Sequence, residues 1–319
     1  MHIFDEHHKD FHGFSKYFKD HVLTRLELAE VARVDAVAKA KKRALMSGLI
    51  GIIIAVLLFL KTQEIALLII PLVLCGLIGW GWGSTALSPI KSETKTHLVS
   101  HISQFLGWEF TEKVEEPPNI LETLFANRLL TARYDRSNFE DRIRGAAHGA
   151  DFEMIEAHLE RRDTDKDGKT RWVTTFRGQL IGMDFHREFL GKTVVLRDKK
   201  IFNTKTKAGM KRVGLADPVF EKIFEAYGTD QVEARYLLTP TFMQRLVDLE
   251  TQVSGKNIRF GFVDGLLLIV VETENRFEAG SMFKSLIDPE RTQKILDEFG
   301  AVLDVIDGVL KPDNYRAVI

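Results

Sequence analysis

The sequence has very little cysteine: Cys75 is the only one among 319 residues. An intramolecular disulfide needs two cysteines, so none can form, and nothing in the chain implies an oxidising compartment. An excess of charge of one sign is lacking as well, because 44 Lys and Arg residues are balanced by 45 Asp and Glu residues, for a formal net charge of −1. This balance gives no electrostatic reason to expect a nucleic-acid partner.

The sequence also lacks the short motifs of several large enzyme classes. It contains no Gly-x-Ser-x-Gly nucleophile elbow, no P-loop, no dinucleotide-binding glycine pattern and no His-Glu-x-x-His zinc motif. The single cysteine lies inside an apolar run and is therefore not a candidate nucleophile. We expect no cofactor, and the lack of these motifs favours a protein that is not an enzyme.

The chain does contain two charge-free apolar runs, residues 44–60 and 65–82, separated by four polar residues. At about 1.5 Å per residue, a helix of this length covers roughly 26 Å, close to the roughly 30 Å hydrocarbon core of a bilayer. The short connector predicts two antiparallel neighbours. We therefore interpret residues 44–82 as a transmembrane helical hairpin; the alternative is a buried hairpin in a soluble protein.

Basic residues are concentrated at the outer ends of the two runs. Lys41, Lys42 and Arg43 precede the first run, and Lys91 and Lys95 follow the second, whereas the connector carries a single lysine. The positive-inside rule then predicts that both termini are cytoplasmic. Lys41, Lys42 and Arg43 are also placed to contact anionic lipid headgroups.

Each apolar run carries small residues at intervals of four. Such residues let helix backbones approach closely in lipid. Our hypothesis is that the two rows pack against each other; the alternative is that one row faces a second copy of the chain and makes a homo-oligomer. The rows are Ser47, Gly51 and Ala55 in the first run, and Cys75, Gly79 and Gly83 in the second.

The remaining chain divides into three predicted parts. Residues 1–43 are expected to form a cytoplasmic amphipathic helix that continues into the first span. Residues 83–118 are expected to form a juxtamembrane stalk, with a helix that begins at Pro89 and ends near Gly107. Residues 119–319 are expected to form a cytoplasmic domain.

The predicted cytoplasmic domain mixes strands and helices. A period of two predicts strands at 155–160, 171–185, 192–197 and 230–238, and Asp264-Gly265 predicts a hairpin turn between 258–263 and 266–273. Prolines at first helical positions predict helices over 217–227, from 240 to about 253 and from 289 to about 308. We therefore predict an α+β fold with a mainly antiparallel sheet and flanking helices.

One motif imitates a calcium site. Asp163, Asp165 and Asp167, followed by Gly168, reproduce the first half of an EF-hand loop. The second half fails, because Thr174 stands where a bidentate glutamate is needed. We interpret the segment as a charged hairpin loop, for which Asp and Gly are suitable turn residues, and predict no metal site.

The alternative to a binding function is a membrane-associated enzyme, such as a hydrolase, with an active site built from residues far apart in the sequence. Glu233 and Arg235 fall on one face of a segment that alternates as a strand, where they form either a ligand site or an ion pair. Convergence of the candidate side chains in one pocket would favour the enzyme. The candidates are His158, Asp184, His186, Glu233 and Arg235.

Three segments carry a family resemblance: TTFRGQLIGMDFHREFLGKTVVL, FEAYGTDQVEARYLLTPTFMQRL and IRFGFVDGLLLIVVETENRFEAG. With the two apolar runs before them, they make residues 40–310 similar to the bacterial membrane proteins described as domain of unknown function 3137. The most specific piece is Tyr227–Met243. The resemblance implies a two-span protein of the bacterial inner membrane with a cytoplasmic α+β domain, and it brings no activity, cofactor or catalytic residue. Our leading hypothesis is a membrane-anchored module that binds lipid or an unknown protein partner.

Overall fold

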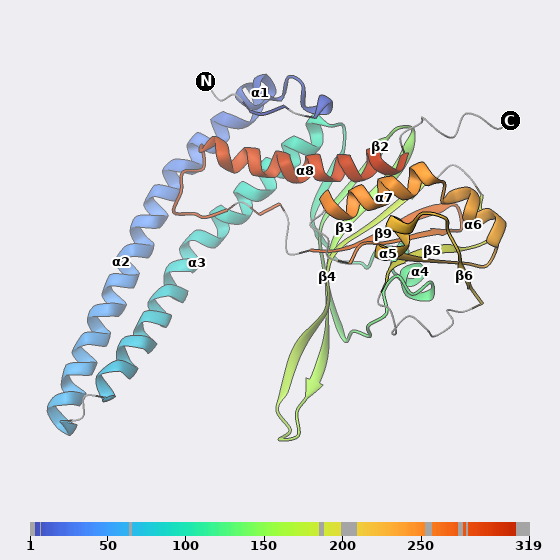
Figure 1. The fold of residues 1–319 in the computed structure, drawn as a ribbon. Helices are drawn as coiled ribbons and strands as arrows, with labels where there is room; N and C mark the ends of the chain where they lie inside the picture. The colour runs from blue at the N-terminus through green and yellow to red at the C-terminus, as the bar shows by residue number, and fades with distance from the viewer. Residues whose placement is uncertain are drawn as a thin grey trace. The chain divides into compact units, whose positions relative to one another are not determined.

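The computed structural model describes residues 4–6, 8–63, 66–184, 188–198, 209–252, 257–273, 277–278 and 280–310. The chain forms two compact units (Figure 1). The helical unit comprises residues 1–105 and 277–296, and the sheet unit comprises residues 106–276 and 297–319.

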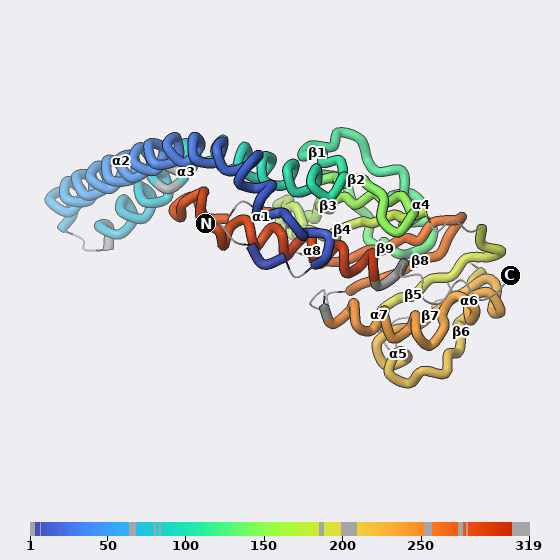
Figure 2. The backbone as a smooth tube through the Cα atoms, turned by 90° about the horizontal axis from the view of Figure 1, so that it is seen from above, coloured from blue at the N-terminus to red at the C-terminus, as the bar shows by residue number. Residues whose placement is uncertain are grey.

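Two long helices dominate the helical unit, α2 (Leu23–Thr62) and α3 (Ala66–Phe105), and they lie side by side (Figures 1 and 2). α2 ends where Gln63 takes a left-handed conformation, with φ 60°. The prediction that a new helix begins at Pro89 is wrong, because Pro89 lies inside α3, as Pro71 does. Packing against α2 lets α3 continue across both prolines despite the backbone hydrogen bond that each removes.

The N-terminal segment folds back onto the end of α3. It consists of the short helices η1 (Lys9–Phe11), α1 (Phe14–Tyr17) and η2 (Phe18–Val22). Phe14 and Phe18 are almost completely buried, and the Phe14 ring lies 5.2 Å from the ring of Phe105. The apolar side of this segment is therefore covered by protein.

The sheet unit contains a sheet in which nine strands are described, in the order β1-β2-β3-β4-β9-β8-β5-β7-β6. Every recorded strand pair is antiparallel, which confirms the predicted α+β fold with a mainly antiparallel sheet. The strands are β1 (Glu109–Val114), β2 (Arg136–Ala147), β3 (Ala150–Thr164), β4 (Thr170–Asp184), β5 (Thr193–Arg197), β6 (Lys211–Val213), β7 (Phe224–Gly228), β8 (Arg259–Val263) and β9 (Leu266–Glu272).

Helices cover both faces of this sheet. Residues of α4 (Ile120–Ala126) form one apolar core with Leu180 and Leu268, while Phe242 of α7 (Pro240–Gln252) packs 5.7 Å from the ring of Phe262. Trp108 and Phe299 of α8 (Pro289–Leu310) stack at 6.2 Å. Because both faces are buried, β9 is a continuous apolar run instead of an alternating one.

One segment that was predicted to be a strand is a helix in the structure. Residues 230–238 were expected to be extended, but Gln231–Leu237 form helix α6. The Asp230 carboxylate accepts hydrogen bonds from the N–H groups of Val232 and Glu233, which makes it an N-cap.

One predicted helix is shorter in the structure, and one predicted hairpin turn is confirmed. The helix predicted over 217–227 is shorter, since α5 (Pro218–Ile223) is followed directly by β7. The hairpin at Asp264-Gly265 is confirmed, with φ angles of 52° and 80° that suit a two-residue turn.

Candidate functional site

Small residues of α2 and α3 lie in close contact with each other. A Cβ atom on Gly51 would lie 2.8 Å from the Cβ of Cys75, and one on Gly79 would lie 2.9 Å from the Cβ of Ser47. Ser47 also donates a hydrogen bond to the Cys75 carbonyl. These positions of the two small-residue rows therefore face each other within one chain.

The ends of the two rows differ in what the structure describes. Ala55 is 3% exposed on the buried side of α2, together with Ser47 at 5%. Gly83 lies in α3, and its burial falls outside what the structure describes.

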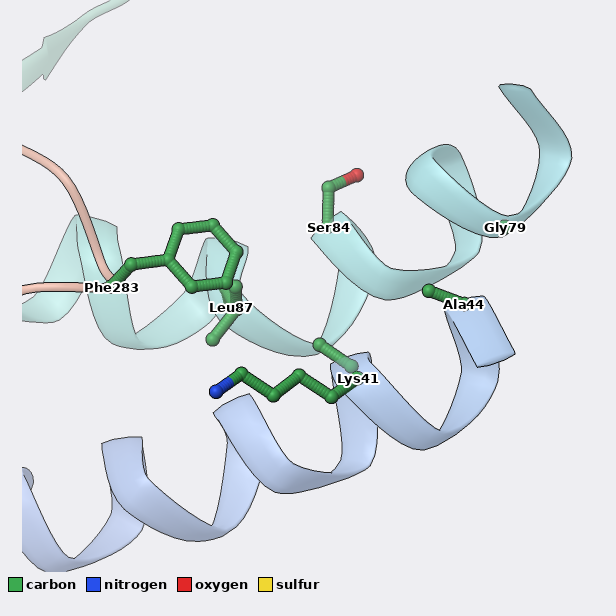
Figure 3. A pocket seen from close by; sticks show the side chains of 7 residues that line it. Lys41, Ala44, Gly79, Ser84, Leu87 and Phe283 are labelled. Atoms are coloured by element: carbon green, nitrogen blue, oxygen red, sulfur yellow. The ribbon is translucent and has the colours of Figure 1, made fainter. Parts of the chain in front are cut away.

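A cavity of about 170 Å³ opens beside Gly79, at the border between the apolar and charged parts of both helices (Figure 3). We call it the interhelical cavity. Its lining is almost wholly apolar because small residues leave the gap unfilled and the stem of Lys41 contributes methylene groups. Figure 3 shows the ring of Phe283 beside Leu87. The lining residues are Ala40, Lys41, Ala44, Gly79, Ser84, Leu87 and Phe283.

The segment that carries Phe283 is held against α2 by an ion pair. The Arg33 guanidinium donates to both carboxylate oxygens of Glu30, at 2.7 and 2.8 Å, and to the Met282 carbonyl at 2.8 Å. Glu30 in turn accepts the Leu286 N–H at 2.8 Å. We call Glu30 and Arg33 the clamp.

The two side chains of the clamp carry opposite charges and are largely shielded from water. Hydrogen bonds from Arg33, opposed by burial and aided by the Leu286 N–H, lower the pKa of Glu30 from 4.5 to about 2. Glu30 raises the pKa of Arg33 in return. Both groups therefore stay charged across the physiological range, and their charges fix the backbone of the segment.

Positive charge lies next to the cavity. Lys41 and Lys42 are exposed, and the Arg43 guanidinium lies 5.4 Å from the ring centre of Trp82 while donating to the Trp82 carbonyl at 3.1 Å. Within the described part of the chain, no ion pair joins these three residues to a carboxylate, whereas nearby Lys39 pairs with Asp35.

The four predicted catalytic residues that the structure describes do not gather in one place. His158 on β3 lies opposite Arg177 on β4, and the seven-residue step from Arg177 to Asp184 covers about 23 Å along the strand. His158 bonds the hydroxyl of its neighbour Thr174 at 2.9 Å. His186 lies outside the described residues.

Glu233 and Arg235 take different roles on α6. Glu233 is 6% exposed and accepts the N–H groups of Leu190 and Gly191, both at 2.7 Å. Arg235 is exposed and donates to Gly214 and Gln231. The expectation that they share a strand face is wrong because the segment is helical, and Glu233 anchors the chain before β5.

This anchoring role predicts an effect on stability. Glu233→Ala should lower the free energy of unfolding by about 1–3 kcal/mol, because two N–H groups lose their acceptor. Arg235→Ala, on the same helix but exposed, should change it by less than about 0.5 kcal/mol. Denaturant titration of the full-length protein in detergent measures both, and an equal loss in the two variants would contradict the anchoring role.

The Asp163 motif forms the tip of the β3–β4 hairpin, which projects from the sheet (Figure 1). Asp165 accepts the N–H groups of Asp167 and Lys169, at 3.0 and 2.8 Å, and Asp163 pairs with Arg171. These contacts are those of a turn. Among the described residues, no group of three or more His, Cys, Asp or Glu side chains could hold a metal ion.

The sheet unit has an open groove of about 590 Å³ near the ends of β3 and β4. Asp184 lines it, whereas His158, Glu233 and Arg235, the other candidates within the described ranges, do not. The Glu153 carboxylate in this groove is paired with Arg144 at 2.9 Å. One acidic group of the groove, Glu153, is therefore already held in an ion pair.

The fold and site define a class: an α+β sheet protein that carries a pair of long apolar helices. Residues 174–311 match the family model described as protein of unknown function (DUF3137), which confirms the predicted family for that part of the chain. No curated protein matches the chain. Among solved structures, the chain is similar to the mycobacterial trehalose monomycolate transport factor A, TtfA, with 10% identity and a TM-score of 0.34, over 64% of this chain and 93% of that one.

Proposed function

We propose that the protein is a membrane-anchored binding module, held by α2 and α3. One observation carries this proposal: within the apolar runs of both helices, most large aliphatic side chains are exposed, whereas Ser47, Gly51 and Ala55 are buried. Ile53, Leu57 and Leu77 are 59%, 61% and 65% exposed, while Ser47 is 5% exposed. Water disfavours such a surface and hydrocarbon favours it.

Length and composition are consistent with this placement. Both helices are long and apolar enough to cross a membrane. The basic residues at Lys41, Lys42 and Arg43 support an orientation with both termini in the cytoplasm and Gln63 near the opposite face. The family resemblance supports the bacterial inner membrane as the location.

Binding is favoured over catalysis by how the candidate residues are used. Glu233 anchors a loop, His158 and Asp184 lie far apart along the sheet, and Arg235 is exposed on α6. By contrast, the apolar interhelical cavity lies beside Lys41, Lys42 and Arg43, for which the described residues supply no carboxylate partner. We propose that anionic lipid is one partner, contacted through Lys41, Lys42 and Arg43, each with about 1 kcal/mol of attraction near the surface.

The anchor predicts a labelling pattern in intact cells. With Cys75 replaced by alanine, Gln63→Cys should react with a membrane-impermeant maleimide from outside. Thr24→Cys should react only after the cells are permeabilised. Both positions are exposed in the structure. The protein should also stay in the pellet after carbonate extraction; release into the supernatant, or labelling of Thr24→Cys in sealed cells, would contradict the proposal.

A further inference from the structure

The interhelical cavity lies where an acyl chain and a headgroup would meet. Ala44 begins the apolar run of α2, and Gly79 lies near the end of the apolar run of α3. The helices touch at Gly79, since its Cβ position is 3.3 Å from the Cα of Ala44. The cavity starts at this contact and reaches Leu87 and Phe283, so it extends from the apolar part of the helix pair into the charged part.

The side chains that line the cavity favour an amphiphilic ligand. Ala40, Ala44 and Leu87 offer only hydrocarbon, and an apolar cavity of this kind does not hold water well. Lys41 lines the same cavity with its stem and ends in a charged ammonium (Figure 3). A ligand that fills the cavity and meets this charge has an apolar chain and an anionic end.

Phe283 closes one side of the cavity and is itself 56% exposed. The backbone position of Phe283 is fixed, because the clamp holds the chain on both sides of it, at Met282 and Leu286. Met282 and Leu286 are also buried against Ala36, Ala40 and Leu87. The exposed ring is thus kept at the cavity by a fixed segment, where it can cover a bound chain.

We propose that the interhelical cavity binds one acyl chain of an anionic phospholipid, with Lys41 at the headgroup and Phe283 over the chain. The charge complementarity of Lys41, Lys42 and Arg43 assigns the anionic headgroup. The inference rests on the proposed membrane anchorage, because only a bilayer supplies this ligand at the level of Ala44. It adds a defined site to the general attraction between basic residues and lipid.

Native mass spectrometry of the full-length protein, released from nanodiscs of mixed phosphatidylglycerol and phosphatidylcholine, tests the site. The wild type should retain one phosphatidylglycerol molecule. Ala44→Phe, which fills the cavity, should lose it, and Ser84→Phe should lose it from the α3 side. Ala38→Phe is the matched control, because Ala38 is exposed on α2 and does not line the cavity.

The headgroup assignment has its own measurement. Lys41→Gln should reduce the preference for phosphatidylglycerol over phosphatidylcholine about fivefold, which corresponds to about 1 kcal/mol per charge. Equal retention in the wild type and both filled variants would overturn the site, as would loss in Ala38→Phe as well. Retention of phosphatidylcholine at the same level would overturn the charge assignment. If the protein stays in the membrane after carbonate extraction but retains no phosphatidylglycerol, the lipid site is refuted and the membrane anchor is not. Release of the protein by carbonate refutes the anchor.

Discussion

Arg33→Ala should detach the Ser281–Leu286 segment from α2 and lower the free energy of unfolding by about 3 kcal/mol, the lower end of the range for breaking a buried ion pair. Arg33 is 9% exposed, and its loss leaves the Glu30 carboxylate shielded from water without its partner. The Met282 carbonyl loses its donor at the same time. Hydrogen exchange should rise at Leu286, whose N–H bonds Glu30.

The same helix offers a matched control. Arg25 forms an ion pair with Glu93 at 2.9 Å, but both side chains are more than 60% exposed. Arg25→Ala should therefore change the free energy of unfolding by no more than about 1 kcal/mol. A loss in Arg25→Ala as large as that in Arg33→Ala would show that the clamp has no special role.

The clamp also predicts a dependence on pH. The pKa of Glu30 is lowered from 4.5 to about 2 in the folded protein, so the folded state holds the proton less tightly than the unfolded state. The contribution of Glu30 to stability is then fully present above pH 4.5 and is lost as the pH falls from 4.5 towards 2. Glu30→Gln should remove this part of the pH dependence, which exchange at Leu286 measures.

The clamp and the cavity show why part of this site could not be predicted from the sequence. Glu30 and Arg33 are three apart on a helix, a spacing typical of exposed pairs of small energy. Their importance comes from Met282 and Leu286, which follow about 250 residues later. A contact over that separation leaves no local pattern, and Phe283 could not be placed beside Lys41 without the fold.

The fold itself was predicted where strong local signals agreed with tertiary packing. The apolar runs, the Asp264-Gly265 turn and the helix beginning at Pro289 follow from local chemistry alone. The failures occurred where two signals competed. At 230–238 the cap of Asp230 outweighed the alternating pattern, and at Pro89 packing against α2 outweighed a local breaker.

Gly51→Ala should separate α2 from α3 and lower the free energy of unfolding in detergent by about 1–3 kcal/mol, the usual cost of overpacking a close contact. The added Cβ would lie 2.8 Å from the Cβ of Cys75 and 3.2 Å from the Pro71 carbonyl. Gly48→Ala is the control, because a Cβ there meets nothing within 4 Å. Titration with sodium dodecyl sulfate, followed by far-ultraviolet circular dichroism, measures both variants.

A second substitution separates steric contact from a general effect of losing glycine. Cys75→Gly removes the side chain that the new Cβ meets, so Gly51→Ala in that background should cost less than Gly51→Ala alone. The difference is the coupling energy of the contact, which falls within about 0.5–3 kcal/mol for neighbouring residues. Purely additive effects would mean that Gly51 and Cys75 do not touch within one chain, which leaves either rows that face a second copy of the chain or helices that have come apart. A dependence of the titration midpoint on protein concentration would then distinguish that oligomer from a single chain whose helices have come apart.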